Sequence, residues 1–245
     1  MGFKERLTKE WLFWDGGTGS VLQSWGLQAG ELPETWNINH PEKIIELNKG
    51  YLEAGCDIIN TNTFGANRLK YPDNLEEIVT KAVEHAKKAR ELTGRTDALI
   101  SLDLGPTGKL LEPLGDLSFD DAVDIYAEVI EYGTKAGADV ILIETMQDSY
   151  ELKAAVLAAK EHSDLPVCAT VVFDEKGKML TGGTPESVVA LLEGLHIDAL
   201  GINCSLGPRQ IKPFVERMIQ VSSTPLIVTP NAGLPQTDDA GHTYY

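Results

Sequence analysis

The sequence predicts an α/β fold and, within that class, a (β/α)8 TIM barrel of which about seven βα units are present in the 245 residues. Seven short runs rich in Val, Ile and Leu lack the alternation of half-exposed strands, which indicates strands buried on both faces. Helical patterns separate these runs. Polar residues follow nearly every run, as they do at the carboxyl ends of barrel strands.

The predicted strands follow one another at the spacing of repeated βα units. They occupy residues 12–17, 57–64, 98–105, 139–146, 166–173, 199–205 and 225–233. This alternation favours parallel pairing through right-handed crossovers. The residues after Gly233 read as loop, so we expect residues 1–245 to form one barrel domain that lacks the C-terminal βα unit.

Helix signals lie between the strands. Residues 41–54 begin with Pro and place apolar side chains at i, i+3, i+7 and i+8 from Ile44, which predicts an amphipathic helix. Ser118 begins a Ser-x-x-Asp cap before a later helix. Pro185 and Pro208 take first-turn positions in two more helices.

The junction from helix to strand recurs along the chain. "EAGCDIINTNTF" (53–64) and "KAGADVILIETM" (135–146) share Ala-Gly, one residue and Asp before a strand, and "LHIDALGINCS" (195–205) is a looser third copy. Gly55 and Gly137 suit helix ends that need a positive φ. The first strand leads into "DGGTGS" rather than the Gly-x-Gly-x-x-Gly fingerprint of an open dinucleotide-binding sheet, so a closed barrel is favoured.

The composition limits the classes of partner. A hydrophobic fraction of 42% and a charged fraction of 24% are those of a globular protein with a core. A net charge of −16 argues against binding to nucleic acid or anionic membranes, both of which attract clustered Lys and Arg. The sequence shows no signal-peptide core and no membrane-spanning apolar run, and its three widely spaced Cys indicate reduced thiols, so we expect a cytoplasmic protein.

Polar residues at the predicted strand ends form the candidate site. They are Asp15 with Gly16 and Gly17, Asn60, Asn62 and Thr63, Asp103, Glu144 and Thr145, Asp174, Asn203 and Cys204, and Asn231. Glu144 ends the buried run "VILI", where a carboxylate needs a cationic partner or a functional role. Cys204 lies at the polar end of its strand, whereas Cys56 and Cys168 lie at strand starts and suit buried packing positions. No local His or Cys spacing gives a complete metal site.

Five motifs occur in order, each at a strand end: "DGGTGS" (15–20), "NTNTFGAN" (60–67), "IET" (143–145), "GINCSLGP" (201–208) and "TPNAG" (229–233). On these motifs the sequence resembles the homocysteine S-methyltransferase family from about residue 11 to about residue 236. Within that family it is most similar to the N-terminal homocysteine-binding modules of cobalamin-dependent methionine synthases. The resemblance implies a (β/α)8 barrel that holds one Zn²⁺ through three Cys thiolates.

The resemblance assigns the zinc site in part. It makes Cys204 a catalytic residue and the first zinc ligand, and it lets Asn231 occupy the zinc position that the substrate thiolate later takes. The other two ligands in the family are an adjacent Cys pair in a Gly-Gly-Cys-Cys-Gly segment of the last strand. That segment does not occur before Tyr245, so we expect an incomplete zinc site in this chain.

The resemblance also implies how homocysteine is bound. Asp15 and Glu144 take its amino group. Backbone N–H groups near Gly16 and Gly17 hold its carboxylate. Thr63 lines the same pocket.

The implied reaction is methyl transfer to the homocysteine thiol, which gives methionine. A thiol with a pKa of about 8.5 is mostly protonated at neutral pH, and zinc coordination deprotonates it to the reactive thiolate. The implied donor is methylcobalamin on a separate module or protein, recharged by methyltetrahydrofolate on another; related members use betaine or S-methylmethionine. We expect the isolated chain to be inactive or impaired.

Two other readings stay open on the sequence alone. The chain could be a non-catalytic truncated barrel that acts as a binding or assembly subunit. It could instead be a barrel enzyme in which Asp15, Asp103 and Glu144 hold a divalent cation such as Mg²⁺, which prefers oxygen ligands. A Schiff-base lyase is disfavoured because no predicted strand end offers a Lys.

Overall fold

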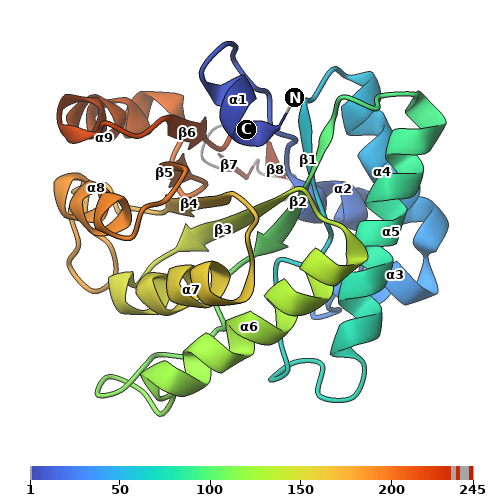
Figure 1. Cartoon of the computed structure of the whole chain (residues 1–245), viewed down its shortest axis with the longest axis horizontal. Helices are drawn as coiled ribbons and strands as arrows, with labels where there is room; N and C mark the ends of the chain where they lie inside the picture. The colour runs from blue at the N-terminus through green and yellow to red at the C-terminus, as the bar shows by residue number, and fades with distance from the viewer. Residues whose placement is uncertain (1, 233–235, 238–242, 245) are drawn as a thin grey trace.

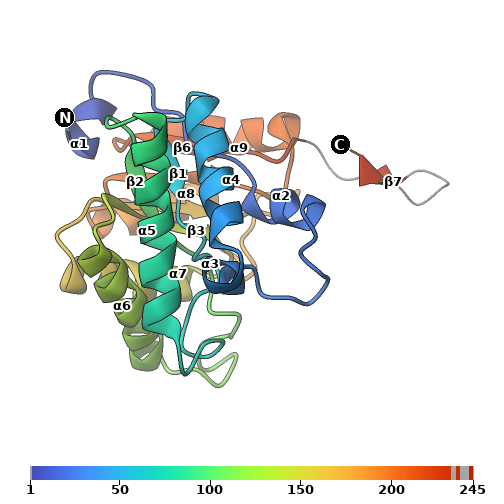
Figure 2. The same cartoon turned by 90° about the vertical axis from the view of Figure 1, so that its right-hand side faces the viewer.

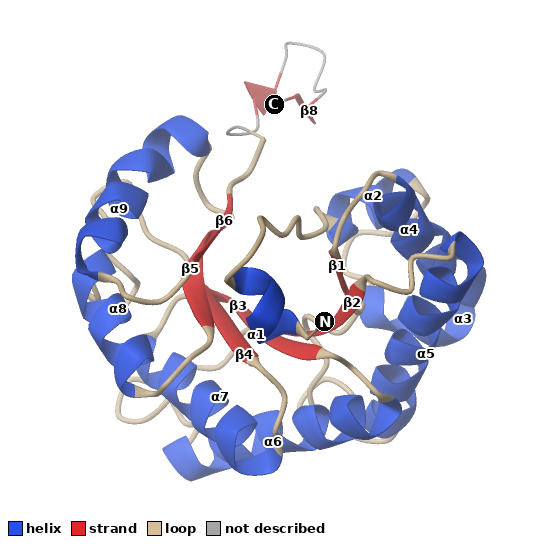
Figure 3. Ribbon diagram, turned by 45° about the horizontal axis from the view of Figure 1, so that its top comes forward, coloured by secondary structure: helices blue, strands red, loops and turns tan. Residues whose placement is uncertain are grey.

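The computed structural model describes residues 2–232, 236–237 and 243–244 (Figure 1). Six parallel strands pair in chain order in one curled sheet. They are β1 (Ile58–Asn60), β2 (Leu99–Leu104), β3 (Val140–Met146), β4 (Val167–Val171), β5 (Ala199–Asn203) and β6 (Leu226–Thr229). Figure 3 shows helices following one another around the outside of the curved sheet, as in a barrel that is open between β6 and β1. The predicted α/β barrel class is confirmed.

Helices connect the strands and form the outer layer. They are α1 (Phe3–Leu7), α2 (Thr18–Ser24), a short 3-10 turn (Pro33–Thr35), α3 (Trp36–Asn39), α4 (Pro41–Glu53), α5 (Leu75–Thr93), α6 (Phe119–Ala136), α7 (Ser149–His162), α8 (Pro185–Gly194) and α9 (Pro208–Val221). α4 and α5 lie side by side over β1 and β2 (Figure 2). Leu52, Ile59, Ala86 and Ile100 are buried between these four elements.

The helix boundaries follow the signals in the sequence. Ser118 Oγ accepts a hydrogen bond from the N–H of Asp121 at 3.1 Å and so caps α6. Pro185 and Pro208 are the first residues of α8 and α9, where a missing N–H costs no helical hydrogen bond.

The recurring junction places left-handed residues after the helices. Gly55 has a φ of 103° and Gly137 a φ of 97°. In the looser third copy His196 takes this conformation with a φ of 55°. The first two copies use Gly because a side chain disfavours this region of backbone space.

The first predicted strand, residues 12–17, is not a strand of the sheet. Trp14 forms a single bridge with Ile58. The N–H of Asp15 donates to the carbonyl of Ile58 at 3.0 Å, and the chain then turns at the Gly pair into α2. The turn ends the pairing after one register position, so the described sheet has six strands rather than the predicted seven.

The last predicted strand is shorter than expected. β6 ends at Thr229, and part of the region expected to be loop is paired: β7 (Gln236–Thr237) is antiparallel to β8 (Thr243–Tyr244). Figure 2 shows β7 apart from the six-stranded sheet. Residues 233–235, 238–242 and 245 lie outside the described residues, and the loop prediction for them is untested.

Helix α1 covers the amino ends of the strands. Phe3 of this helix packs with Ile58, Val140, Leu142 and Cys168 in a buried cluster. Cys168 therefore has the packing role expected for a Cys at a strand start.

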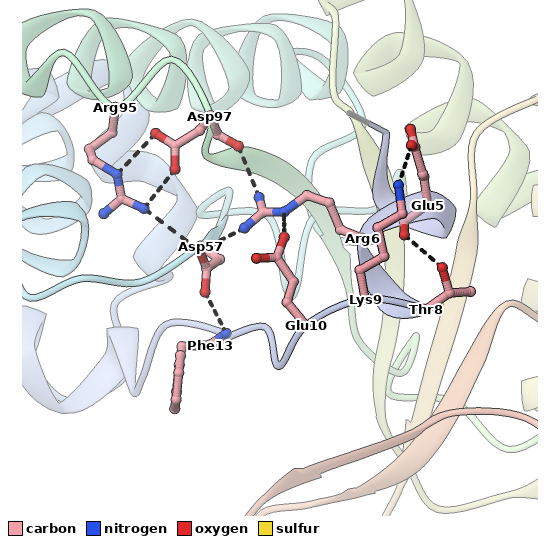
Figure 4. A network of polar contacts seen from close by, with 9 residues as sticks. All are labelled: Glu5, Arg6, Thr8, Lys9, Glu10, Phe13, Asp57, Arg95 and Asp97. Carbon is pink, nitrogen blue, oxygen red and sulfur yellow. Dashed lines mark hydrogen bonds and ion pairs between the residues drawn. The ribbon is translucent and has the colours of Figure 1, made fainter.

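Arg6 attaches α1 to this end of the sheet. Its guanidinium binds Asp57 Oδ1 at 2.8 Å, Glu10 Oε1 at 2.6 Å and the carbonyl of Asp97 at 3.0 Å. Arg95 contacts Asp97 at 3.1 Å and extends the network (Figure 4). The amino end of the sheet is thus filled and cross-linked, and the carboxyl end is left for a site.

Candidate functional site

The carboxyl ends of the strands surround a cavity of about 510 Å³. Of the residues expected to bind substrate or metal, its wall includes all but Thr63: Asp15, Gly16, Gly17, Glu144, Cys204 and Asn231. These residues are far apart in the sequence, and they meet because parallel strands all end at the same edge of a sheet. Asp174, also predicted at a strand end, lies outside this wall and accepts the N–H groups of Lys176 and Lys178 in its own loop.

Thr63 lies behind the cavity wall. Its side chain is fully buried, and its hydroxyl donates to the carbonyl of Asp103 at 2.7 Å. Thr61 Oγ1 lies 2.7 Å from Thr63 Oγ1 and accepts the N–H of Asp103 at 3.2 Å. The two Thr side chains therefore fix the backbone of Asp103, and the hydroxyl of Thr63 is already used within the protein.

Asp15 presents a carboxyl that is half satisfied. Its Oδ2 accepts the N–H of Asn60 at 2.7 Å, whereas its Oδ1 is buried without a hydrogen-bond partner. Burial raises the pKa of Asp15 to about 8, and the negative charge of Glu144 adds to this rise.

Glu144 and Asp103 lie in the same cavity wall. Burial raises the pKa of Glu144 to about 7. The pKa of Asp103 is well above its usual range, first because of burial and then because of the charges of Glu144 and Asp15. In the described part of the chain, no ion pair joins any of these three carboxyls to a Lys, Arg or His. The cavity therefore favours a ligand that brings positive charge.

Asn203 joins two strand ends at the cavity. Its Nδ2 donates to Thr145 Oγ1 at 2.7 Å, its Oδ1 accepts the N–H of Thr145 at 3.0 Å, and its Nδ2 lies 3.3 Å from Cys204 Sγ. The sequence predicts that Asn203 lies at a strand end but does not indicate this role. The one feature that could have indicated it is the position of an amide side chain directly before the candidate thiol.

A backbone hydrogen bond fixes Cys204 in a strained backbone conformation. Its N–H donates to the carbonyl of Thr229 at 3.0 Å, and its φ is 50°. Gly201 precedes it in β5, where an added Cβ would lie 1.8 Å from the carbonyl oxygen of Ile227, so this position of the GINC motif requires Gly. Burial, followed by the charge of Glu144, raises the pKa of the Cys204 thiol. The described surroundings thus favour the neutral thiol.

The side chains that the structure describes do not complete a metal site. In the described residues, no group of three or more His, Cys, Asp and Glu is arranged to hold a metal ion. A catalytic zinc takes three protein ligands, and here Cys204 is the one thiol that lines the cavity. The same observation argues against the alternative in which Asp15, Asp103 and Glu144 hold a divalent cation.

Comparison with known proteins agrees with the motifs. The model of the homocysteine S-methyltransferase family matches residues 12–245. The chain belongs to the homocysteine S-methyltransferase family. It is 30% identical to methionine synthase from Mycobacterium tuberculosis (strain ATCC 25618 / H37Rv) over 248 residues, which cover 94% of this chain and 21% of that protein. The chain thus spans about a fifth of the length of this curated relative.

Solved structures show the same fold. The oxidized form of the homocysteine methyltransferase MmuM from Escherichia coli has a TM-score of 0.82 at 23% identity, covering 93% of this chain and 85% of that chain. The metallated form of the same enzyme has a TM-score of 0.80 at 23% identity, covering 93% and 86%. The chain therefore shares its fold with these structures.

None of the described helices is both long enough and apolar enough to cross a membrane.

Proposed function

We propose that residues 1–245 form a homocysteine-binding barrel domain of an enzyme that transfers a methyl group to the homocysteine thiol and so forms methionine. Family membership supports the class of reaction. The observation that carries the proposal is the cavity, where the desolvated carboxyls of Asp15 and Glu144 lie with the thiol of Cys204.

The ammonium group of the substrate would pair with the two carboxyls. Asp15 Oδ1 is a buried acceptor without a donor, and Glu144 has no ion-pair partner in the described residues. Charge-assisted hydrogen bonds to a carboxylate are among the stronger polar contacts in proteins. The N–H groups of Gly16 and Gly17 donate to no acceptor in the described residues, so both are open to the substrate carboxylate.

The substrate thiol must ionise before it attacks a methyl group. Zinc supplies this chemistry when bound, because it deprotonates a coordinated thiol at neutral pH. Cys204 and Asn231 would hold the ion from this chain, and the existence of a metallated form of the E. coli enzyme supports a metal in this fold. Because one thiol is a weak ligand set, we expect zinc to be retained poorly and the isolated chain to be inactive or impaired.

The proposed methyl donor is methylcobalamin on a separate module or protein, with methyltetrahydrofolate recharging it on another. The similarity to methionine synthases, of which this chain spans a fifth, supports a division of the reaction among modules. A non-catalytic binding subunit would use the same cavity, and it would bind homocysteine without supporting methyl transfer when the cobalamin and folate modules are added.

Calorimetric titration of the full chain with L-homocysteine tests the proposal. Wild-type protein should bind the amino acid, and Glu144→Gln should weaken binding by about tenfold because it removes a charge without removing a hydrogen bond of the folded protein. Glu175→Gln changes an exposed carboxyl outside the cavity and should leave the affinity unchanged. Absence of homocysteine binding to the wild-type chain would refute the proposed function.

A further inference from the structure

Buried polar atoms without partners concentrate in the cavity. In the described residues, five buried side-chain atoms lack a hydrogen-bond partner, and three of these belong to residues that line the cavity: Asp15 Oδ1, Asp103 Oδ1 and Thr170 Oγ1. An unsatisfied buried polar atom destabilises a folded protein, so native structures contain few of them. Their concentration in one cavity indicates that a ligand supplies the missing donors.

Asp103 is the more deeply buried of the two carboxyls among these groups. The residue is 6% exposed and lies near the end of β2. The ring of hydrogen bonds with Thr61 and Thr63 occupies both its N–H and its carbonyl. The backbone is therefore fixed, and the carboxyl is held at the cavity wall rather than free to turn toward solvent.

The neighbours of Asp103 make its ligand a cation. After burial, the negative charges of Glu144 and Asp15 contribute most to the raised pKa of Asp103, followed by that of Glu34. Glu34 is itself occupied, because its carboxylate accepts the Gly65 N–H and the Tyr71 hydroxyl. Asp103, Asp15 and Glu144 thus remain as three carboxyls with unused acceptor capacity in one cavity.

We propose that Asp103 is a third carboxyl of the ammonium site, which requires a primary ammonium group on the substrate. This inference rests on the proposed function. An R–NH3⁺ group has three N–H donors, one for each of the three carboxyls that line this cavity. Its N···O distances of about 2.7–2.9 Å are longer than the Mg–O bonds of about 2.0–2.1 Å, so carboxyls spaced too widely for a metal ion can still surround an ammonium group. Asp103 then determines specificity, because it distinguishes a free amino acid from a simple thiol and from an N-substituted amino acid.

The test measures the affinity of the full chain for L-homocysteine and for 4-sulfanylbutanoate, which keeps the thiol and carboxylate but lacks the amino group. Asp103→Asn should weaken homocysteine binding by about tenfold and leave binding of the analogue unchanged. The midpoint of thermal unfolding should not fall, because the substitution removes an unpaired buried carboxyl. The control is Ser101→Ala on the same strand, which removes a buried unpaired hydroxyl outside the cavity wall and should affect neither affinity.

A second measurement needs no variant. N-methyl homocysteine keeps two N–H donors, enough for Asp15 and Glu144 but one too few for three carboxyls. The wild-type chain should bind it about tenfold more weakly than homocysteine. Equal binding of these two ligands, or unchanged homocysteine affinity in Asp103→Asn, would overturn the inference and leave the proposed function standing.

A structural role for Asp103 would give a different pattern. Asp103→Asn would then lower the unfolding midpoint and weaken both ligands equally, which would also overturn the inference. If the wild-type chain binds no homocysteine, the proposed function fails and the inference fails with it.

Discussion

The side-chain amide of Asn203 forms a reciprocal pair of hydrogen bonds with Thr145, at 2.7 Å to its hydroxyl and 3.0 Å from its N–H. These bonds join the ends of β3 and β5 across the intervening β4. Thr145, with a φ of 61°, and Cys204, with a φ of 50°, both hold the left-handed backbone conformation that side chains disfavour. Asn203 therefore stabilises two strained residues: Thr145, which follows Glu144, and Cys204, which carries the thiol.

Replacing Asn203 should release both strand ends. Asn203→Ala leaves the Thr145 N–H and hydroxyl without their partner, and we expect the free energy of unfolding to fall by about 1–3 kcal/mol. Homocysteine affinity should fall as well, because the backbone next to Glu144 is no longer fixed by these hydrogen bonds. Urea unfolding and calorimetric titration measure the two effects. Asn62→Ala also removes a buried amide that lines the cavity, but its hydrogen bonds go to Pro33 and Asn37. If both variants lose the same affinity, Asn203 has no special positioning role.

Stability should depend on pH through Asp15. The pKa of this carboxyl is raised from 3.8 to about 8 in the folded protein, so between these values the folded state keeps a proton that the unfolded state releases. The contribution of Asp15 to stability therefore falls as pH rises from about 4 to about 8 and is constant above that range. Asp15→Asn removes this titrating carboxyl, and the stability of the variant relative to wild type should increase with pH across this window. Urea unfolding at several pH values measures the difference, and a difference that stays constant would contradict the account.

Gly16 should tolerate no side chain without loss of binding. An added Cβ would lie 3.0 Å from the hydroxyl oxygen of Tyr51, which donates to the carbonyl of Gly17 at 3.2 Å. Gly16→Ala should displace Tyr51 and the Gly16–Gly17 backbone and weaken homocysteine binding severalfold, with a small loss of stability. Gly50→Ala is the matched control on α4, because its Cβ meets no atom within 4 Å and Ala favours the helix by about 1 kcal/mol. Equal affinities of the two variants would remove the role proposed for the Gly pair.

The network at the opposite end should affect stability alone. Arg6→Ala leaves Asp57 half-buried without its closest cation, and we expect the free energy of unfolding to fall by about 2–4 kcal/mol. Lys81→Ala breaks an exposed pair with Glu84 and should lower the free energy of unfolding much less, because exposed ion pairs contribute little to stability. Denaturant unfolding compares the two. Because the network lies at the amino ends of the strands, homocysteine affinity should be unchanged in a folded Arg6→Ala protein; a selective loss of affinity would show that the two ends are coupled.

Most of the strands could be predicted from the sequence, because short apolar runs between helical patterns are typical of parallel strands buried on both faces. The prediction of a strand at residues 12–17 was wrong because Trp14 pairs with Ile58 at one position only before the Gly pair turns the chain into α2. Residue propensities do not show where the pairing between two strands ends. The strand-end residues could be grouped because parallel strands share an edge. The orientation of each side chain could not be predicted, because it depends on the pleat and the loop conformation. For this reason the sequence did not predict that Thr63 lies behind the cavity wall or that the side chain of Asn203 forms hydrogen bonds with Thr145.

The central claim is that the cavity binds homocysteine through its ammonium group. A crystal structure of the chain with L-homocysteine tests this claim most directly. We expect the amino nitrogen within hydrogen-bond distance of Asp15 Oδ1 and of the Glu144 carboxylate, the carboxylate of the ligand at the N–H groups of Gly16 and Gly17, and its sulfur toward Cys204. A ligand bound in the reverse orientation, with its amino group away from both carboxyls, or bound outside the cavity would contradict the account.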